Sequence, residues 1–133
     1  MTNAWLATLA SVLIIPVIMV VIGLIIKRFP PKKINSFYGY RTPMSKKNED
    51  TWRFANLYSA KLFLWIGLIL IPVSVVPLLF LLKKSEDILV IASTVITAAD
   101  VTALLASAIA TEIALRKNFE RDGSRRADIE QKS

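Results

Sequence analysis

The sequence contains no cysteine and no histidine. The first absence excludes disulfide bonds and thiolate metal sites, and the second removes the commonest general base and the commonest transition-metal ligand. No acidic cluster is dense enough to suggest a site for Mg²⁺ or Ca²⁺. We therefore expect no metal, no cofactor and no enzymatic activity.

Charge is absent from two long stretches and nearly absent from a third. Trp5 to Ile26 and Leu62 to Leu82 carry no charged residue, and Ile88 to Leu115 carries only Asp100 and Glu112. A helix rises about 1.5 Å per residue and a bilayer core is about 30 Å thick, so each run is long enough to cross it. The sequence predicts an all-α integral membrane protein with three transmembrane helices.

The length of the chain limits what else it can contain. With 133 residues and three spans, no room remains for a separate soluble catalytic domain. We expect one membrane module over residues 1–121, with a loop over 27–61, and a charged, disordered tail over 122–133. The first run lacks a basic residue before it and is followed by Lys27 and Arg28, so we do not expect it to be a cleaved signal peptide.

The basic residues are unevenly distributed between the two sides of the predicted membrane. Nine lie between Lys27 and Lys61 and six follow from Arg116, whereas the turn between the second and third spans holds Lys83 and Lys84. The positive-inside rule places the loop and the C-terminus in the cytoplasm and the N-terminus outside. Contact with anionic headgroups explains the net charge of +7, so we predict no direct binding of nucleic acid.

The third run carries a polar face. Its members share a narrow arc of the helix, interrupted by Leu104, and are Ser93, Thr97, Asp100, Ser107 and Thr111. Such a face packs against other helices, lines a wet cavity, or is buried in a homo-oligomer. Asp100, at mid-membrane, is either a functional group for a cation, a proton or a basic peptide, or a structural group hydrogen-bonded to Thr97 or Ser74.

The second and third spans are predicted to form a helical hairpin, because only Lys83 to Asp87 connect them. Lys61 and Glu112 lie at similar distances along the chain before and after Ser85, so the hairpin should place them at similar depth. We predict that these two residues form an ion pair near the inner boundary.

The loop before the second span is predicted to contain an amphipathic helix. Asn48 is a favourable N-cap, and Glu49 and Asp50 follow it in the positive first turn. This helix is expected to run into the second span, with Trp52 seated at the membrane interface.

A spaced set of residues in this loop forms a distinctive pattern. It comprises Asn35, Gly39, Arg41, Thr42, Pro43, Asn48, Trp52 and Asn56. A Gly-x-Arg-Thr-Pro element followed by Asn-x-x-x-Trp-x-x-x-Asn resembles the signature loop of the SdpI family.

The resemblance implies a protein of the bacterial cytoplasmic membrane that confers immunity to a secreted peptide toxin. It also implies signalling, in which a cytoplasmic repressor is sequestered at the membrane. The motif holds no nucleophile or catalytic base. We hypothesise that Gly39 lets the loop fold back on the bundle, where Arg41 pairs with Glu112, a tail acid or a lipid phosphate.

Two other functions remain open from the sequence. The polar face around Asp100 suits a small transporter or channel subunit. The small residues of the third run also suit a structural accessory subunit of a larger membrane complex.

Overall fold

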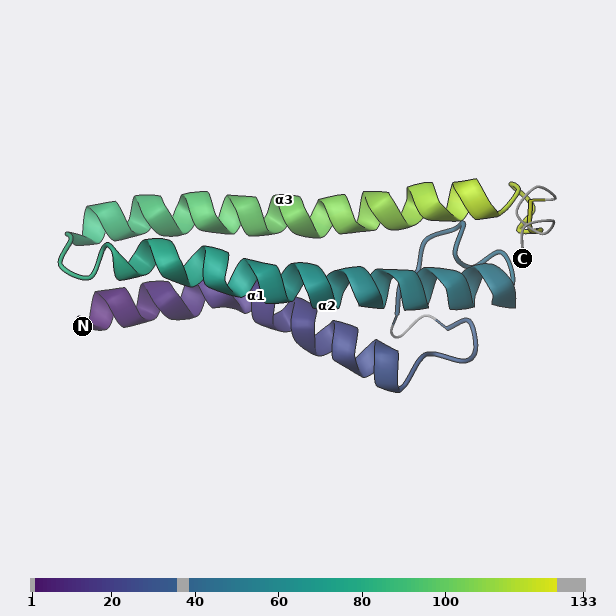
Figure 1. Cartoon of the computed structure of the whole chain (residues 1–133), viewed down its shortest axis with the longest axis horizontal. Helices are drawn as coiled ribbons and strands as arrows, with labels where there is room; N and C mark the ends of the chain where they lie inside the picture. Colours follow the sequence, from purple (N-terminus) through teal and green to yellow (C-terminus); the bar gives the residue numbers. More distant parts are fainter. Residues whose placement is uncertain (1, 36–38, 127–133) are drawn as a thin grey trace.

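The computed structural model describes residues 2–35 and 39–126. Its described part is three helices, α1 (Asn3–Arg28), α2 (Glu49–Leu79) and α3 (Glu86–Asn118), arranged side by side as a bundle (Figure 1). All three are long and apolar enough to cross a membrane. The predicted all-α membrane fold with three spans is confirmed.

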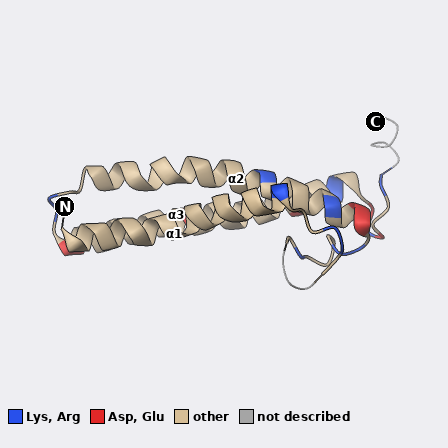
Figure 2. Ribbon diagram, turned by 90° about the horizontal axis from the view of Figure 1, so that it is seen from below, with Lys and Arg blue, Asp and Glu red and all other residues tan. Residues whose placement is uncertain are grey.

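The two ends of the bundle differ in the segments they carry. We call the end with the N-terminus and the α2–α3 turn (residues 80–85) the hairpin end. The other end, with the α1–α2 connection (residues 29–48) and the segment after α3, is the loop end (Figure 1). Basic residues gather at the loop end, and the helices between the ends are largely free of charge (Figure 2).

Local sequence signals explain where α1 and α2 begin and end. The α1 helix stops at Arg28, two residues before Pro30-Pro31, because proline lacks the N–H that would continue the helix. The α2 helix begins with a capping box, in which Asn48 Oδ1 accepts from Thr51 N–H and Thr51 Oγ1 accepts from Asn48 N–H. The predicted helix start at Glu49 and its continuation into the second span are confirmed.

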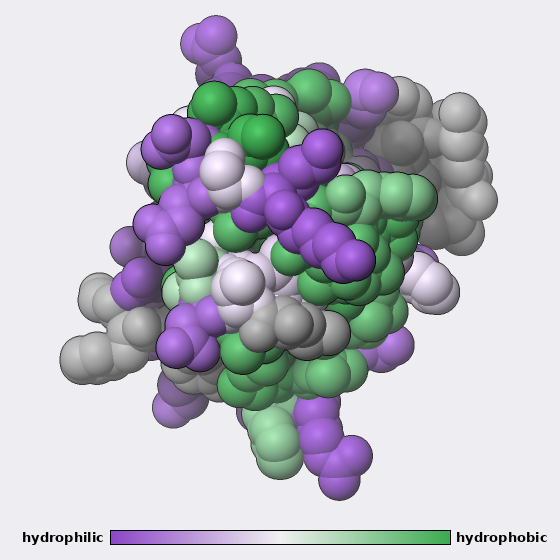
Figure 3. Space-filling view, turned by 90° about the vertical axis from the view of Figure 1, so that its left-hand side faces the viewer, coloured by the Kyte–Doolittle hydropathy of each residue, from purple (hydrophilic) through white to green (hydrophobic). Residues whose placement is uncertain are grey.

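The hairpin end is closed mainly by apolar side chains. Trp5, Val12, Leu78 and Leu89 form a buried cluster that joins all three helices. The Trp5 indole Nε1–H also donates to the carbonyl of Leu78 at 2.8 Å. Seen from this end, hydrophilic side chains lie among apolar ones (Figure 3).

The α2 helix ends earlier than the predicted span. It stops at Leu79, whereas we predicted a span to Leu82. The N–H groups of Phe80 and Leu81 bond to the carbonyls of Pro77 and Leu78, three residues back, so the chain leaves the helix through a tightened turn. The predicted antiparallel hairpin of the second and third spans is confirmed.

Two glycines allow α1 and α2 to pack closely. A Cβ on Gly23 would lie 2.8 Å from the carbonyl oxygen of Ala60, and one on Gly67 would lie 2.9 Å from that of Pro16. Both neighbours are backbone atoms, which cannot move aside cheaply. This close contact fixes how α1 crosses α2, and from it α1 turns away from α3 toward the loop end (Figure 1).

Candidate functional site

The loop-end site is organised by the buried side chain of Asn56, on α2. Its Oδ1 accepts a hydrogen bond from Tyr40 N–H at 2.7 Å, and its Nδ2 donates to the carbonyls of Trp52 at 2.9 Å and Tyr40 at 3.4 Å. An asparagine side chain thus binds the backbone of the loop much as a neighbouring strand would. The loop is fixed to α2 at this point.

Gly39 provides the backbone conformation that this contact requires. Its φ is +101°, a region that L-residues with a Cβ rarely adopt. A Cβ there would also collide with Asn56 Oδ1 and lie 3.0 Å from Pro31 Cγ. The hypothesis that Gly39 lets the loop fold back against the bundle is supported by this geometry.

Trp52 has a different role from the one we predicted. It is fully buried, and its indole Nε1–H donates to the carbonyl of Pro31 at 2.6 Å. The prediction that Trp52 sits at the membrane interface is therefore wrong. The residue faces inward because the same face of α2 carries Asn56 and Ser59, which are also buried, so Trp52 anchors the start of the loop.

Thr42 and Pro43 belong to a tight turn that Ser45 closes. Thr42 N–H donates to Ser45 Oγ at 2.8 Å, and Ser45 N–H donates to Thr42 Oγ1 at 3.2 Å. The Thr51 hydroxyl then donates to the carbonyl of Ser45 at 3.0 Å. The Thr-Pro element is thus connected to the first turn of α2.

Tyr40 connects the loop to α3. Its hydroxyl donates to Glu112 Oε1 at 2.7 Å and lies 3.1 Å from the carbonyl of Ala108. Burial, together with the hydrogen bond and negative charge of Glu112, raises the pKa of the Tyr40 phenol well above its ordinary value. Tyr40 therefore remains a neutral donor, and the loop bridges α2 and α3.

The predicted ion pair between Lys61 and Glu112 is not formed. The salt bridges among the residues of ranges 2–35 and 39–126 join Arg125 to Asp50 and Arg126 to Glu120. Glu112 is bound by Tyr40 instead, because the loop folds between α2 and α3, whereas Lys61 is exposed. The prediction compared only the depths of α2 and α3 on either side of Ser85, so it took no account of the loop.

The first residues of the predicted disordered tail are folded. Phe119 is fully buried and packs edge-on against Phe54 at 5.5 Å between ring centroids. The chain then turns, with Glu120 N–H donating to the Ser124 carbonyl at 2.7 Å, and Asn48 Nδ2 donates to the Gly123 carbonyl at 2.6 Å. The prediction of disorder is wrong for residues 122–126, and 127–133 lie outside the described residues.

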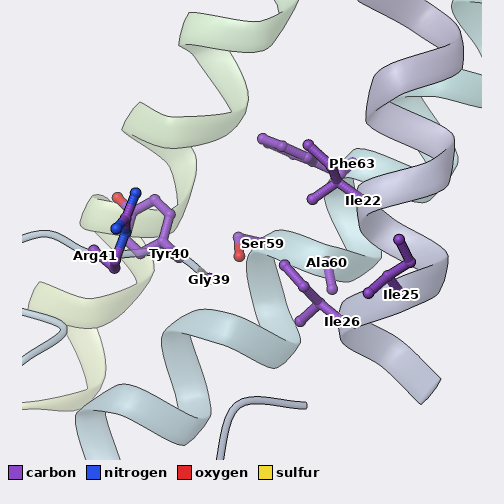
Figure 4. A pocket seen from close by; sticks show the side chains of 9 residues that line it. All are labelled: Ile22, Ile25, Ile26, Gly39, Tyr40, Arg41, Ser59, Ala60 and Phe63. Atoms are coloured by element: carbon purple, nitrogen blue, oxygen red, sulfur yellow. The ribbon is translucent and has the colours of Figure 1, made fainter. Parts of the chain in front are cut away.

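Arg41 borders a pocket of about 550 Å³ at the loop end. Ile22, Ile25 and Ile26 of α1 form one side, and Tyr40 and Arg41 form the other (Figure 4). The remaining lining residues are Gly39 and, from α2, Ser59, Ala60 and Phe63.

Asn35 lies at the edge of the site. Its Nδ2 donates to the carbonyl of Lys33 at 3.0 Å, and its side chain is half-buried. Three residues of the sequence pattern meet where the loop passes α2: Trp52 binds the backbone at Pro31, Asn56 binds it at Tyr40, and Gly39 lies against both Pro31 and Asn56.

The polar face of α3 points largely into the bundle. Asp100, Ser107 and Thr111 are buried, and Ser93 and Thr97 are half-buried. Ser74 Oγ lies 3.4 Å from both carboxyl oxygens of Asp100, so the structural interpretation with Ser74 as the partner is the one the geometry supports. Ser107 and Thr111 donate to carbonyls of their own helix.

Sequence reasoning missed the contributions of Tyr40, Ser45 and Thr51. The pattern of eight loop residues includes none of the three. The Asn48-x-x-Thr51 spacing is a capping signal that could have identified Thr51. Nothing in the local sequence indicates the contact of Tyr40 with Glu112, which lies 72 residues away.

Comparison with known proteins identifies the family of the chain. Residues 32–111 match the model of the SdpI/YfhL protein family, a range that contains most of the α1–α2 connection, α2 and most of α3. The chain is also 44% identical over 82 residues to the uncharacterized protein YfhL of Bacillus subtilis, covering 60% of this chain and 72% of that protein. No solved structure matches the chain. The chain is thus a membrane protein that belongs to the SdpI/YfhL family.

Proposed function

We propose that this protein confers tolerance to a secreted peptide toxin in a bacterial cytoplasmic membrane, and that its loop end is a docking face for a cytoplasmic repressor. Family membership supports the proposal. The observation that carries it is the bridge made by Tyr40, which Asn56 holds from α2 and Glu112 holds from α3. Any toxin that moves α3 relative to α2 would alter the shape of this face.

The docking role requires the loop end to face the cytoplasm, with the N-terminus outside. The asymmetry of basic residues supports this orientation. Because the chain has no cysteine, single cysteines can test it cleanly. In intact cells, a membrane-impermeant maleimide should label a Lys84→Cys variant and leave Lys47→Cys unlabelled until the cells are opened; the reverse pattern would refute the orientation.

The function is tested by survival of a toxin-sensitive bacterial strain that expresses the chain. We expect protection against at least one member of a panel of secreted peptide toxins, and its loss in Asn56→Ala at unchanged membrane abundance. Asn118→Ala is the matched control, since among the described residues Asn118 Nδ2 bonds to the Ala114 carbonyl of its own helix. Absence of protection by the intact chain would count against the proposal.

A small transporter or channel subunit is the second candidate, and the buried Asp100 is the observation that favours it. The same assay separates the two functions through Asp100→Asn, which keeps the size of the side chain and removes its ability to ionise. Transport should fail in this variant, whereas protection that depends on the loop should survive. A structural accessory subunit would be indicated if the protein co-purified with a larger membrane complex and neither variant had an effect.

A further inference from the structure

The pocket at the loop end combines two chemistries that an anionic phospholipid also combines. Its apolar members Ile22, Ile25 and Phe63 come from helices that cross the membrane, and its charged member, Arg41, comes from the loop. We propose that this pocket binds one anionic phospholipid, with an acyl chain against the isoleucines and the phosphate at Arg41. This inference does not depend on the proposed function.

The shape of the pocket suits an acyl chain that enters from the side. Ile22 and Ile25 are 37% and 48% exposed, so the wall made by α1 is accessible from the region of the lipid tails. The buried Ala60 and Ser59 of α2 lie between this wall and the loop (Figure 4). A volume of about 550 Å³ accommodates a headgroup with part of a chain.

The polar side of the pocket suits a phosphate. Arginine presents a planar fork of donors that matches phosphate oxygens. Among the nine described residues that line the pocket, Arg41 carries the charge and none is acidic.

The surroundings favour an anionic lipid over a zwitterionic one. Lys27 and Arg28 end α1 beside the pocket, and Lys32 and Lys33 follow in the same connection. Each basic residue near a membrane surface attracts anionic lipid by about 1 kcal/mol. The net positive charge of this end therefore selects a headgroup with net negative charge.

The test uses the purified full chain in a neutral detergent, stripped of lipid and examined by native mass spectrometry. We expect one phosphatidylglycerol per chain at concentrations where phosphatidylcholine with the same acyl chains does not bind. Glycerol phosphate, which has the phosphate without acyl chains, should not bind. Equal binding of the two lipids, or binding of glycerol phosphate as tight as that of phosphatidylglycerol, would overturn the proposal.

Two pairs of variants locate the site. Arg41→Gln should weaken phosphatidylglycerol binding about tenfold, the order expected from losing a charge-assisted contact. Arg116→Gln, which removes an exposed arginine at the same end of α3, should leave binding within about twofold. Ile22→Trp should fill the pocket and weaken binding, whereas Ile18→Trp, at an exposed position of α1 outside the pocket, should not.

Equal effects within either pair would refute this location. The Ile22 and Ile18 variants decide the question alone if Arg41→Gln does not fold. Because binding is measured on purified protein, its failure is distinct from a failure of toxin protection in cells.

Discussion

The two ends of the bundle are held together in different ways. At the hairpin end, Trp5, Leu78 and Leu89 pack as an apolar cluster around one indole hydrogen bond. At the loop end, side chains such as Asn56 and Tyr40 bind backbone and carboxylate groups of segments distant in sequence. Apolar packing tolerates small changes of shape, whereas a network of buried hydrogen bonds fails when one partner is lost. The loop end is therefore the part of the molecule with a specified geometry.

The largest effect on stability is expected from a substitution at Gly39 that displaces the loop from α2. Gly39→Ala places a Cβ at a positive φ and against Asn56 Oδ1, which should displace the loop. Strain and lost hydrogen bonds together should lower the free energy of unfolding by about 3 kcal/mol. The midpoint of thermal unfolding in detergent measures this loss, and substitution of the exposed Lys46 by alanine is the control. An unchanged midpoint for Gly39→Ala would contradict the attachment of the loop to Asn56.

The hairpin end should respond less to the loss of the indole hydrogen bond that joins α1 to α2 there. Trp5→Phe removes the bond to the Leu78 carbonyl and leaves a small cavity, which should cost about 2 kcal/mol. Trp65→Phe is the matched control, because Trp65 is 59% exposed on the outer surface of α2 and should be nearly neutral. Equal losses in the two variants would show that Trp5 is no anchor.

The contribution of the Tyr40–Glu112 hydrogen bond can be tested by removing one oxygen atom. Tyr40→Phe leaves the ring in place and takes the hydrogen bond away from Glu112, at an expected cost of about 1.5 kcal/mol. Tyr58→Phe is the control, because Tyr58 is exposed and stacks on Phe54. Comparing the two by hydrogen exchange should show faster exchange in the loop only for Tyr40→Phe, and protection that stays unchanged would contradict the bridge.

The smallest effect is expected from the surface charges of the loop end. Arg125 lies 3.4 Å from Asp50, with both side chains substantially exposed, and its guanidinium also lies over the Phe119 ring. Arg125→Ala should therefore change the free energy of unfolding by about 0.5 kcal/mol or less, and the difference should shrink in high salt. Unfolding at low and high salt measures this; a loss as large as that of Tyr40→Phe would show that this contact belongs to the buried network.

Much of the architecture could be predicted because it follows from local patterns. Apolar runs of sufficient length must be helical in a membrane, so α1, α2 and α3 were predictable in number and approximate extent. The Asn48 cap, the hairpin and the inward face of Asp100, Ser107 and Thr111 also follow from spacing along a helix. The end of α2 at Leu79 was missed because the apolar run continues to Leu82, whereas the N–H groups of Phe80 and Leu81 already bond three residues back.

The contents of the site were less predictable. The pattern identified Gly39, Trp52 and Asn56, but the pattern could not say what they touch. Trp52 was placed at the interface because aromatic residues often lie there, yet its face of α2 is covered by the loop. The prediction of a Lys61–Glu112 ion pair was wrong for the same reason, because the loop places the Tyr40 hydroxyl against Glu112.

The sequence by itself determined that this chain is a membrane protein of three helices whose loop carries a family pattern. These properties depend on hydrophobicity and on signals within a few residues of one another. Only the tertiary structure decided which groups meet, namely Asn56 with Tyr40, Tyr40 with Glu112, and the isoleucines of α1 across the pocket from Arg41. Such contacts join segments far apart in the chain, and they depend on how closely the helices pack and where the loop folds between them.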